Sequence, residues 1–146
     1  VIAGKKEAVE LAATYCKEAG AKRALPLPVS VPSHCALMKP AAEKFAGYLK
    51  EVPFNIPNIP VINNVNVQIE TDAARIKQAL IEQLYSPVRW AETVEWMAKN
   101  GVEILIEIGA GKVLTGLTKR IVASLNSFAV NDLNSLEVAL SNTTTS

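Results

Sequence analysis

The sequence predicts an α/β fold with a largely parallel sheet, because amphipathic helical segments alternate with short extended segments along the chain. The clearest strand is Val102–Ile108, a mostly apolar run that lies between two helical patterns. The chain has 146 residues, of which 49% are hydrophobic, enough for one domain with a substantial core.

The first 31 residues are predicted to form a strand, a helix and a second extended segment. Val1–Ala3 is the short first strand. Lys5–Ala19 is the helix, because its apolar residues recur at helical spacing and Gly20 follows it. Ala24–Val31 is extended, and its two prolines point to an edge or irregular strand.

The middle of the chain is predicted to be mainly helical. A helix runs from about Ser33, its expected N-cap, to Glu51, and Pro40 kinks or restarts it. Ile59–Val67 is predicted as a strand interrupted by a turn at Asn63 and Asn64. Thr71–Tyr85 is predicted as a second amphipathic helix.

The last part alternates helices and strands more regularly. A helix capped by Ser86 and Pro87 runs to Asn100, before the strand at residues 102–108. A turn at residues 109–111 leads into a helix over residues 112–125, and residues 128–130 form a short strand. Asn134 opens a final helix, with Glu137 completing a capping box.

Composition excludes several classes of protein. The net charge of +1 gives no sign of nucleic-acid binding or membrane-surface binding. No apolar run approaches the roughly 20 residues that span a bilayer, and no signal peptide is visible. Cys16 and Cys35 match no disulfide or metal pattern, so we expect a cytoplasmic protein without a metal or cofactor. Because Val1–Ala3 resembles the middle of a strand, we expect a piece of a longer protein, ending in a mobile polar tail over residues 141–146.

The only histidine, His34, is the leading candidate for chemistry. It is predicted to lie where a strand ends and a helix begins, a frequent place for catalytic groups in α/β folds. Imidazole titrates near neutral pH and suits a general base, although a single histidine is also often structural. Adjacent residues point in different directions, which disfavours a catalytic pair with Cys35. The chain offers His34 no visible nucleophile to activate.

Gln83 and two pairs of basic residues each allow two interpretations. Gln83 is predicted to face inward with the apolar stripe of its helix, where it either bonds nearby backbone or orients His34. The doublets Lys22-Arg23 and Lys119-Arg120 are either solvated surface or the rim of a site that attracts an acidic partner. Gly109-Ala-Gly111 lacks the further residues of a P-loop or dinucleotide fingerprint, and is predicted to be a tight strand-to-helix turn.

Three separated segments resemble one family, the bacterial malonyl-CoA:acyl-carrier-protein transacylases. They are Val31-Pro-Ser-His-Cys-Ala-Leu-Met38, Gln83-Leu-Tyr-Ser-Pro-Val-Arg-Trp90 and Glu107-Ile-Gly-Ala-Gly-Lys-Val-Leu-Thr-Gly-Leu-Thr-Lys-Arg120. The resemblance extends from Val1 to about Leu140 and corresponds to roughly the C-terminal half of that enzyme.

The resemblance implies a reaction and roles. A serine in a Gly-His-Ser-Leu-Gly turn would take malonyl from malonyl-CoA and pass it to the phosphopantetheine thiol of acyl carrier protein. His34 would be the base for both steps, and Gln83 would hold it through either its backbone carbonyl or its side chain. Ser33, the residue before the base, corresponds to a position linked to acyl selectivity, and the two basic doublets would be weak candidates for carrier binding.

The resemblance also implies an architecture with a missing part. Residues 1–31 would be half of a ferredoxin-like small subdomain, and residues 32–140 part of an α/β-hydrolase-like subdomain. The serine, the oxyanion-hole donors and the malonyl-binding arginine would lie in an N-terminal half absent from this sequence, so this half alone is expected to be inactive. Alternatives are a non-catalytic carrier-docking fragment and an acyltransferase of different acyl selectivity.

Overall fold

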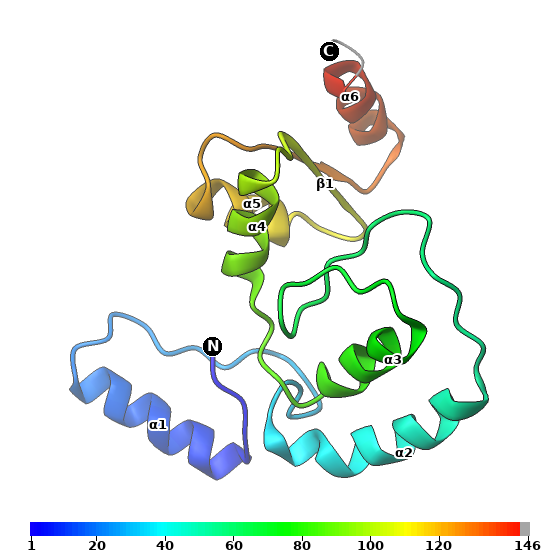
Figure 1. The fold of residues 1–146 in the computed structure, drawn as a ribbon. Coiled ribbons are helices and arrows are strands. Elements are labelled where there is room, and N and C mark those ends of the chain that lie inside the picture. The colour runs from blue at the N-terminus through cyan, green and yellow to red at the C-terminus, as the bar shows by residue number, and fades with distance from the viewer. Residues whose placement is uncertain (144–146) are drawn as a thin grey trace. The chain divides into compact units, whose positions relative to one another are not determined.

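The computed structural model describes residues 1–143, and the chain divides into two compact units, the first over Val1–Val88 and the second from Arg89 onward. Figure 1 shows the ribbon of both units. The division falls elsewhere than the predicted subdomain boundary between residues 31 and 32, which remains a prediction. The predicted tail is helical over residues 141–143, and residues 144–146 lie outside the described part.

The first unit is built around two packed helices. It contains α1 (Lys6–Glu18), the 3-10 helix η1 (Ala36–Met38), α2 (Lys39–Glu51) and α3 (Ala73–Glu82). α2 packs against α3 and η1. Ala42 and Leu49, seven residues apart and therefore on one face, are the buried residues of α2, and Ala79 is that of α3. These two helices carry the segments on either side of the site described below.

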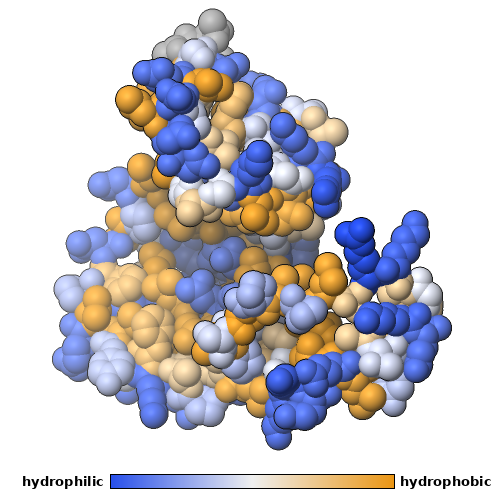
Figure 2. Space-filling view, turned by 180° about the vertical axis from the view of Figure 1, so that it is seen from behind, coloured by the Kyte–Doolittle hydropathy of each residue, from blue (hydrophilic) through white to orange (hydrophobic). Residues whose placement is uncertain are grey.

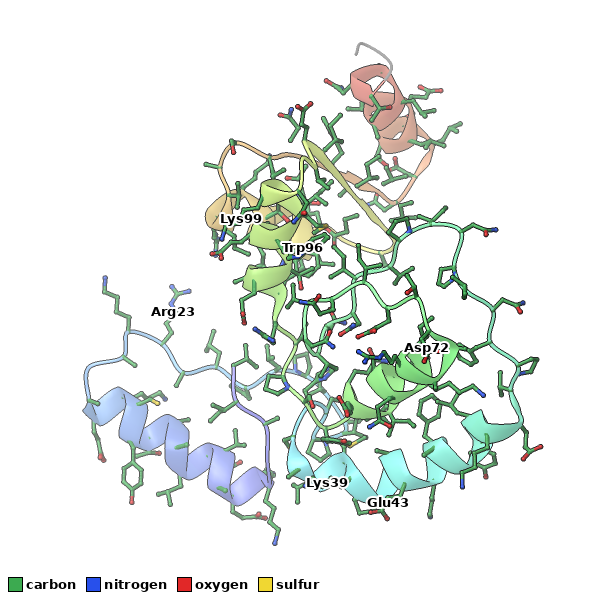
Figure 3. The ribbon with its side chains drawn as sticks, in the orientation of Figure 1. Arg23, Lys39, Glu43, Asp72, Trp96 and Lys99 are labelled. Atoms are coloured by element: carbon green, nitrogen blue, oxygen red, sulfur yellow. The ribbon has the colours of Figure 1, made fainter. Side chains whose placement is uncertain are left out.

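The helix starts follow recognisable rules. Pro40 lies in the first turn of α2, so the predicted restart of the helix at this proline is confirmed. Asp72, which Figure 3 labels, is the N-cap of α3. Its carboxylate accepts a 2.9 Å bond from the Arg75 N–H. Ser33 is not the predicted N-cap, because Cys35 precedes η1 without a capping bond from its side chain.

The second unit is a βαβ unit with flanking helices. Its elements are α4 (Trp90–Lys99), β1 (Ile104–Ile108), α5 (Val113–Ile121), β2 (Asn126–Val130) and α6 (Leu133–Thr143). β1 and β2 pair in parallel, with Ile104 opposite Asn126 and Ile108 opposite Val130. α5 contacts both strands and α4, whereas α6 contacts β2. The α/β class and the parallel pairing are therefore confirmed.

Three segments that the sequence predicts as extended or as strands do not form strands in the structure. Residues 1–3 and 24–31 are irregular in the described chain, where no segment pairs with them. Residues 59–67 contribute only an isolated bridge between Ile62 and Ile69. The side-chain oxygen of Asn63 accepts bonds from the N–H groups of Val65 and Asn66, which turns the backbone away from strand geometry. The turn predicted at Asn63 is thus confirmed, although the strand around it is not.

The predicted caps of the last two α-helices are also corrected. Ser86 and Pro87 lie outside α4, whose N-cap is Arg89. α6 begins earlier than predicted, and its capping pair is Asp132 with Ser135 rather than Asn134 with Glu137. The Asp132 carboxylate accepts from the Ser135 N–H at 2.7 Å, while the Ser135 hydroxyl accepts from the Asp132 N–H at 3.0 Å. The bond from the Ser135 N–H lowers the pKa of Asp132.

Large apolar side chains remain exposed in both units. Leu25 and Ile59 of the first unit are 74% and 77% exposed, and Ile108 of β1 is 82% exposed. Apolar surface is visible in many places in the space-filling view (Figure 2). None of the described helices is long and apolar enough to cross a membrane.

Candidate active site around His34

His34 lies in a tight turn between the loop of residues 19–33 and η1. Its backbone has a φ of 62°, in the left-handed region that few non-glycine residues adopt. Its N–H donates a 3.0 Å bond to the Leu84 carbonyl, just beyond the end of α3. This bond ties the turn to the end of α3, with the imidazole exposed.

The His34 ring contacts two further carbonyl oxygens. Nδ1 lies 2.9 Å from the Gln83 oxygen and 3.2 Å from the Ser86 oxygen. Because a carbonyl oxygen only accepts hydrogen bonds, Nδ1 must carry the proton in both contacts. The neutral ring is then the Nδ1–H tautomer, and Nε2 keeps its lone pair. This arrangement leaves Nε2 able to accept a proton from a substrate or nucleophile.

The structure shows whether Gln83 contacts His34 through its backbone or through its side chain, which the sequence left open. Gln83 is the C-cap residue of α3, and its backbone carbonyl, not its amide side chain, meets Nδ1. Carbonyls in the last turn of a helix lack intrahelical partners, so they are available for such a bond. The structure therefore brings His34 and Gln83 together, one of the two interpretations left open for Gln83, and adds Ser86, which the sequence predicts as part of a helix cap. The orienting role of Gln83 remains a prediction.

The neighbours of His34 in sequence have local contacts. Ser33 is half-buried, and its N–H donates to the Val31 carbonyl at 2.8 Å. The Cys35 thiol donates to the Pro32 carbonyl at 3.2 Å. These bonds shape the turn that presents His34. A substrate-binding role for Ser33 remains a prediction.

The two basic doublets lie in different units. Lys22 and Arg23 are exposed in the segment after α1, and the Arg23 side chain extends away from the ribbon (Figure 3). Lys119 and Arg120 are exposed in the last turn of α5. Cations in the last turn of a helix are favoured by its dipole, so the second doublet also has a local structural explanation.

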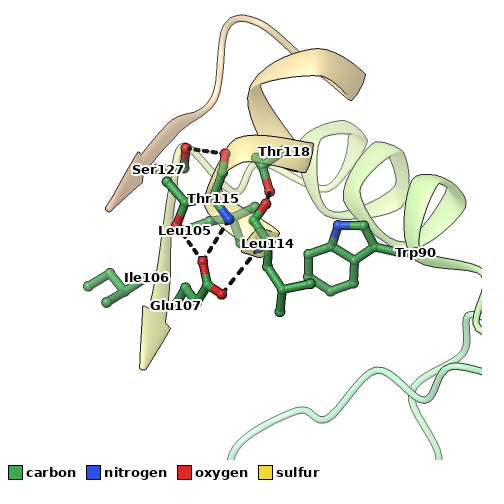
Figure 4. Close-up of a pocket in the computed structure, with 8 residues that line it drawn as sticks. All are labelled: Trp90, Leu105, Ile106, Glu107, Leu114, Thr115, Thr118 and Ser127. Atoms are coloured by element: carbon green, nitrogen blue, oxygen red, sulfur yellow. Dashed lines mark hydrogen bonds between the residues drawn. The ribbon is translucent and has the colours of Figure 1, made fainter. Parts of the chain in front are cut away.

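Glu107 closes the turn that resembled a phosphate loop. Its carboxylate accepts bonds from the Leu114 N–H at 3.1 Å, the Thr115 N–H at 2.8 Å and the Thr115 hydroxyl at 2.8 Å (Figure 4). The N–H groups that could hold a phosphate at the start of α5 are therefore occupied by a side chain of the same chain. Glu107 is not among the candidate site residues that the sequence predicts. The available signal was a carboxylate at a strand end, followed by a short glycine turn into a helix.

A small pocket of about 80 Å³ lies beside this carboxylate, and its lining residues are Trp90, Leu105, Ile106, Glu107, Leu114, Thr115, Thr118 and Ser127 (Figure 4). It is too small for a nucleotide or acyl thioester, since ligand pockets usually hold several hundred Å³. Within residues 1–143, no group of three or more His, Cys, Asp or Glu side chains is placed to hold a metal ion. His34 remains the best candidate for chemistry.

Glu107→Gln is expected to reduce the pH dependence of unfolding of the second unit. The bond from the Thr115 N–H, followed by the bonds from the Thr115 hydroxyl and other N–H groups, lowers the pKa of Glu107 below its ordinary value of 4.5. Ionised Glu107 therefore stabilises the folded state above pH 4.5, and this contribution is lost as the pH falls through the lowered folded pKa.

Urea unfolding of the chain between about pH 3 and about pH 7, monitored by tryptophan fluorescence, measures this effect. The range extends from about one and a half pH units below the ordinary pKa of Glu107 to about two and a half above it. Both tryptophans, Trp90 and Trp96, lie in α4 of the same unit. We expect the wild-type chain to be more stable than the variant at neutral pH and the difference to narrow in acid. The matched control is Glu103→Gln, an exposed carboxylate just before β1. If the stability difference from the wild type decreases in acid equally for Glu107→Gln and Glu103→Gln, the capping role of Glu107 is contradicted.

The comparisons with known proteins agree on one family of names, although no family model matches the chain. The malonyl CoA-acyl carrier protein transacylase of Salmonella typhimurium is 63% identical over 140 residues, which are 96% of this chain and 45% of the relative. The Escherichia coli protein of the same name is 61% identical with the same coverage. The chain thus spans about 45% of the length of these relatives.

Solved structures give the same result. A malonyl-transacylase in complex with a type II polyketide synthase acyl carrier protein superposes with a TM-score of 0.92 at 62% identity, over 95% of this chain and 45% of that one. An acyl carrier protein S-malonyltransferase from Vibrio cholerae gives 0.87 at 69% identity, over 92% and 44%. The resemblance found in the three sequence segments is therefore confirmed over nearly the whole chain.

Proposed function

We propose that this chain is the C-terminal part of a malonyl-CoA:acyl-carrier-protein transacylase, in which His34 is the general base and acid. One observation carries the assignment of His34. Its Nδ1–H is held by the Gln83 and Ser86 carbonyl oxygens, which directs the lone pair to Nε2. The names of the relatives, at 61–63% identity, support the choice of reaction.

The proposed reaction has two proton-coupled steps. In the first, Nε2 of His34 removes the proton from a serine hydroxyl as the serine oxygen attacks the malonyl thioester carbon. The tetrahedral intermediate collapses, the C–S bond breaks, and the coenzyme A thiolate takes the proton from His34. In the second, Nε2 removes the proton from the phosphopantetheine thiol of the carrier. The thiolate attacks the malonyl ester, and the serine oxygen leaves with the proton from His34.

The serine belongs, in this proposal, to an N-terminal half that the sequence does not contain. The chain spans about 45% of its relatives, and strongly exposed apolar side chains such as Leu25, Ile59 and Ile108 support a surface that the remainder covers. The finer architecture is also proposed. Residues 1–31 complete a ferredoxin-like subdomain, residues 32–140 belong to an α/β-hydrolase-like one, and the enzyme works in the cytoplasm without a cofactor.

Acyl carrier protein is the proposed acceptor. One neighbour is a malonyl-transacylase solved in complex with an acyl carrier protein, which supports this partner. The exposed doublets Lys22-Arg23 and Lys119-Arg120 are the proposed weak contacts for an acidic carrier. The alternative function, carrier docking without catalysis, is favoured only by these doublets. It would be distinguished by salt-sensitive carrier binding in the absence of transfer.

The proposed function is tested by combining this chain with an upstream half that bears the Gly-His-Ser-Leu-Gly turn. Both are incubated with malonyl-CoA and holo carrier protein, and malonyl-carrier is detected by intact mass. We expect product from the mixture and none from this chain alone. Equimolar acetyl-CoA as a competitor tests acyl selectivity. Product from the chain alone would contradict the proposal, because the nucleophile would then lie in this chain. Absence of product from a folded mixture would favour the docking alternative.

A further inference from the structure

The segment that follows α3 directs three backbone carbonyls at His34. The Leu84 oxygen accepts from the His34 N–H, and the Gln83 and Ser86 oxygens accept from Nδ1–H. All three precede Pro87 by four residues or fewer. The position of this proline relative to Gln83 explains why these carbonyls are available.

α3 ends at Glu82, and hydrogen-bonded turns continue the chain as far as the residue before the proline. The Leu84 and Tyr85 N–H groups donate three residues back, to the Ile81 and Glu82 oxygens, and the bonds on either side of them span four residues. The Gln83 N–H donates to the Ala79 oxygen at 3.0 Å, and the Ser86 N–H donates to the Glu82 oxygen at 3.0 Å. A further bond spanning four residues, after that of Ser86, would run from the N–H of residue 87 to the Gln83 oxygen. Proline has no N–H, so residue 87 cannot occupy the oxygen that His34 uses.

Pro87 also restricts the backbone of Ser86. The residue before a proline is driven out of the α region, because the proline ring clashes with its backbone and Cβ. Ser86 is accordingly a bend residue, and its carbonyl reaches Nδ1 of His34 at 3.2 Å. A helical Ser86 would direct its carbonyl along the helix axis instead. Pro87 itself is exposed, so deep burial of its ring does not account for its effect.

We propose that Pro87 is a positioning residue for His34. It leaves the Gln83 oxygen without a helical donor and turns the Ser86 oxygen toward the ring, and both effects select the Nδ1–H tautomer. The importance of this selection for catalysis rests on the proposed function, but the tautomer itself does not. A structural readout therefore separates a failure of this proposal from a failure of the function.

The test compares Pro87→Ala with the wild-type chain by nitrogen-15 NMR. His34 is the only histidine, so its two ring nitrogens are assigned without ambiguity. The variant restores an N–H at position 87 and a helix-competent Ser86. We expect this N–H to be protected from hydrogen exchange by the Gln83 oxygen. We also expect the ratio of Nδ1–H to Nε2–H tautomer to fall about two- to tenfold, as for the loss of one hydrogen bond.

A matched control and a second variant keep the result interpretable. Pro57→Ala changes another exposed loop proline, and we expect it to leave the tautomer ratio unchanged. Pro87→Gln restores the same N–H with another helix-competent residue, and serves if Pro87→Ala loses its dispersed amide spectrum. A freely exchanging amide at position 87 together with an unchanged tautomer ratio, in either folded variant, would overturn the proposal.

Discussion

His34→Asn is expected to lower malonyl transfer by the proposed complete enzyme about 10²–10⁴-fold, the usual contribution of a general base. Asparagine is chosen because it tolerates the left-handed backbone that His34 adopts at φ 62°. Its side-chain amide can still donate to the Gln83 and Ser86 oxygens, but it has no basic nitrogen to replace Nε2. We expect the loss in kcat for both half-reactions, measured as coenzyme A release and malonyl-carrier formation.

The control for this prediction is the fold. His34 is exposed, so the amide spectrum and urea midpoint of the His34→Asn chain should match those of the wild type. His34→Ala should be equally inactive but less stable by about 1 kcal/mol, because alanine does not favour the left-handed region. Turnover near the wild-type value in a folded His34→Asn enzyme would exclude His34 as the base.

Val94→Asp is expected to unfold the second unit. Val94 is 0% exposed and lies on α4, which packs against α5. An uncompensated buried charge costs about 3–5 kcal/mol, a large part of the stability of a small domain. Tryptophan fluorescence measures this unfolding, because Trp90 and Trp96 flank Val94 on α4. In the unfolded variant, urea should no longer produce the fluorescence change that accompanies unfolding of the wild type.

Two further substitutions separate the effect of lost apolar contact from the effect of the buried charge on stability. Val94→Ala removes apolar contact without adding charge and should cost about 2 kcal/mol. Val138→Asp places the same charge on α6 at a position 53% exposed, and should change stability little. An equal loss of stability for Val94→Asp and Val138→Asp would show that this part of the chain has no cooperative core.

Much of the fold follows from local patterns in the sequence. The helical spacing in residues 5–19 predicted α1, and the apolar run at residues 102–108 predicted β1. The short strand after α5 was also predicted, because a βαβ unit needs only neighbouring segments. The predicted strand at residues 59–67 failed because Asn63 bonds to nearby N–H groups. Residues 1–3 and 24–31 have no partner strand in the described chain.

The site could be predicted only in part. The type of residue singled out His34, but nothing in its local sequence indicated a left-handed backbone. The inward direction of Gln83 along its helix predicted contact with the site, whereas the contact is made by its carbonyl. Helical periodicity describes side-chain directions and says nothing of which carbonyls lack a donor. The readable signal for that was Pro87, four residues after Gln83.

The position of the proton on the neutral His34 ring of the wild-type chain decides whether Nε2 can act as the base. Nitrogen-15 spectra of the neutral ring distinguish its two tautomers by the chemical shifts of the ring nitrogens. The contacts with Gln83 and Ser86 predict that Nδ1 carries the proton and Nε2 the lone pair. A folded chain in which Nε2 carries the proton would exclude Nε2 of His34 as the base, because the nitrogen left to act as a base would then face two carbonyl oxygens.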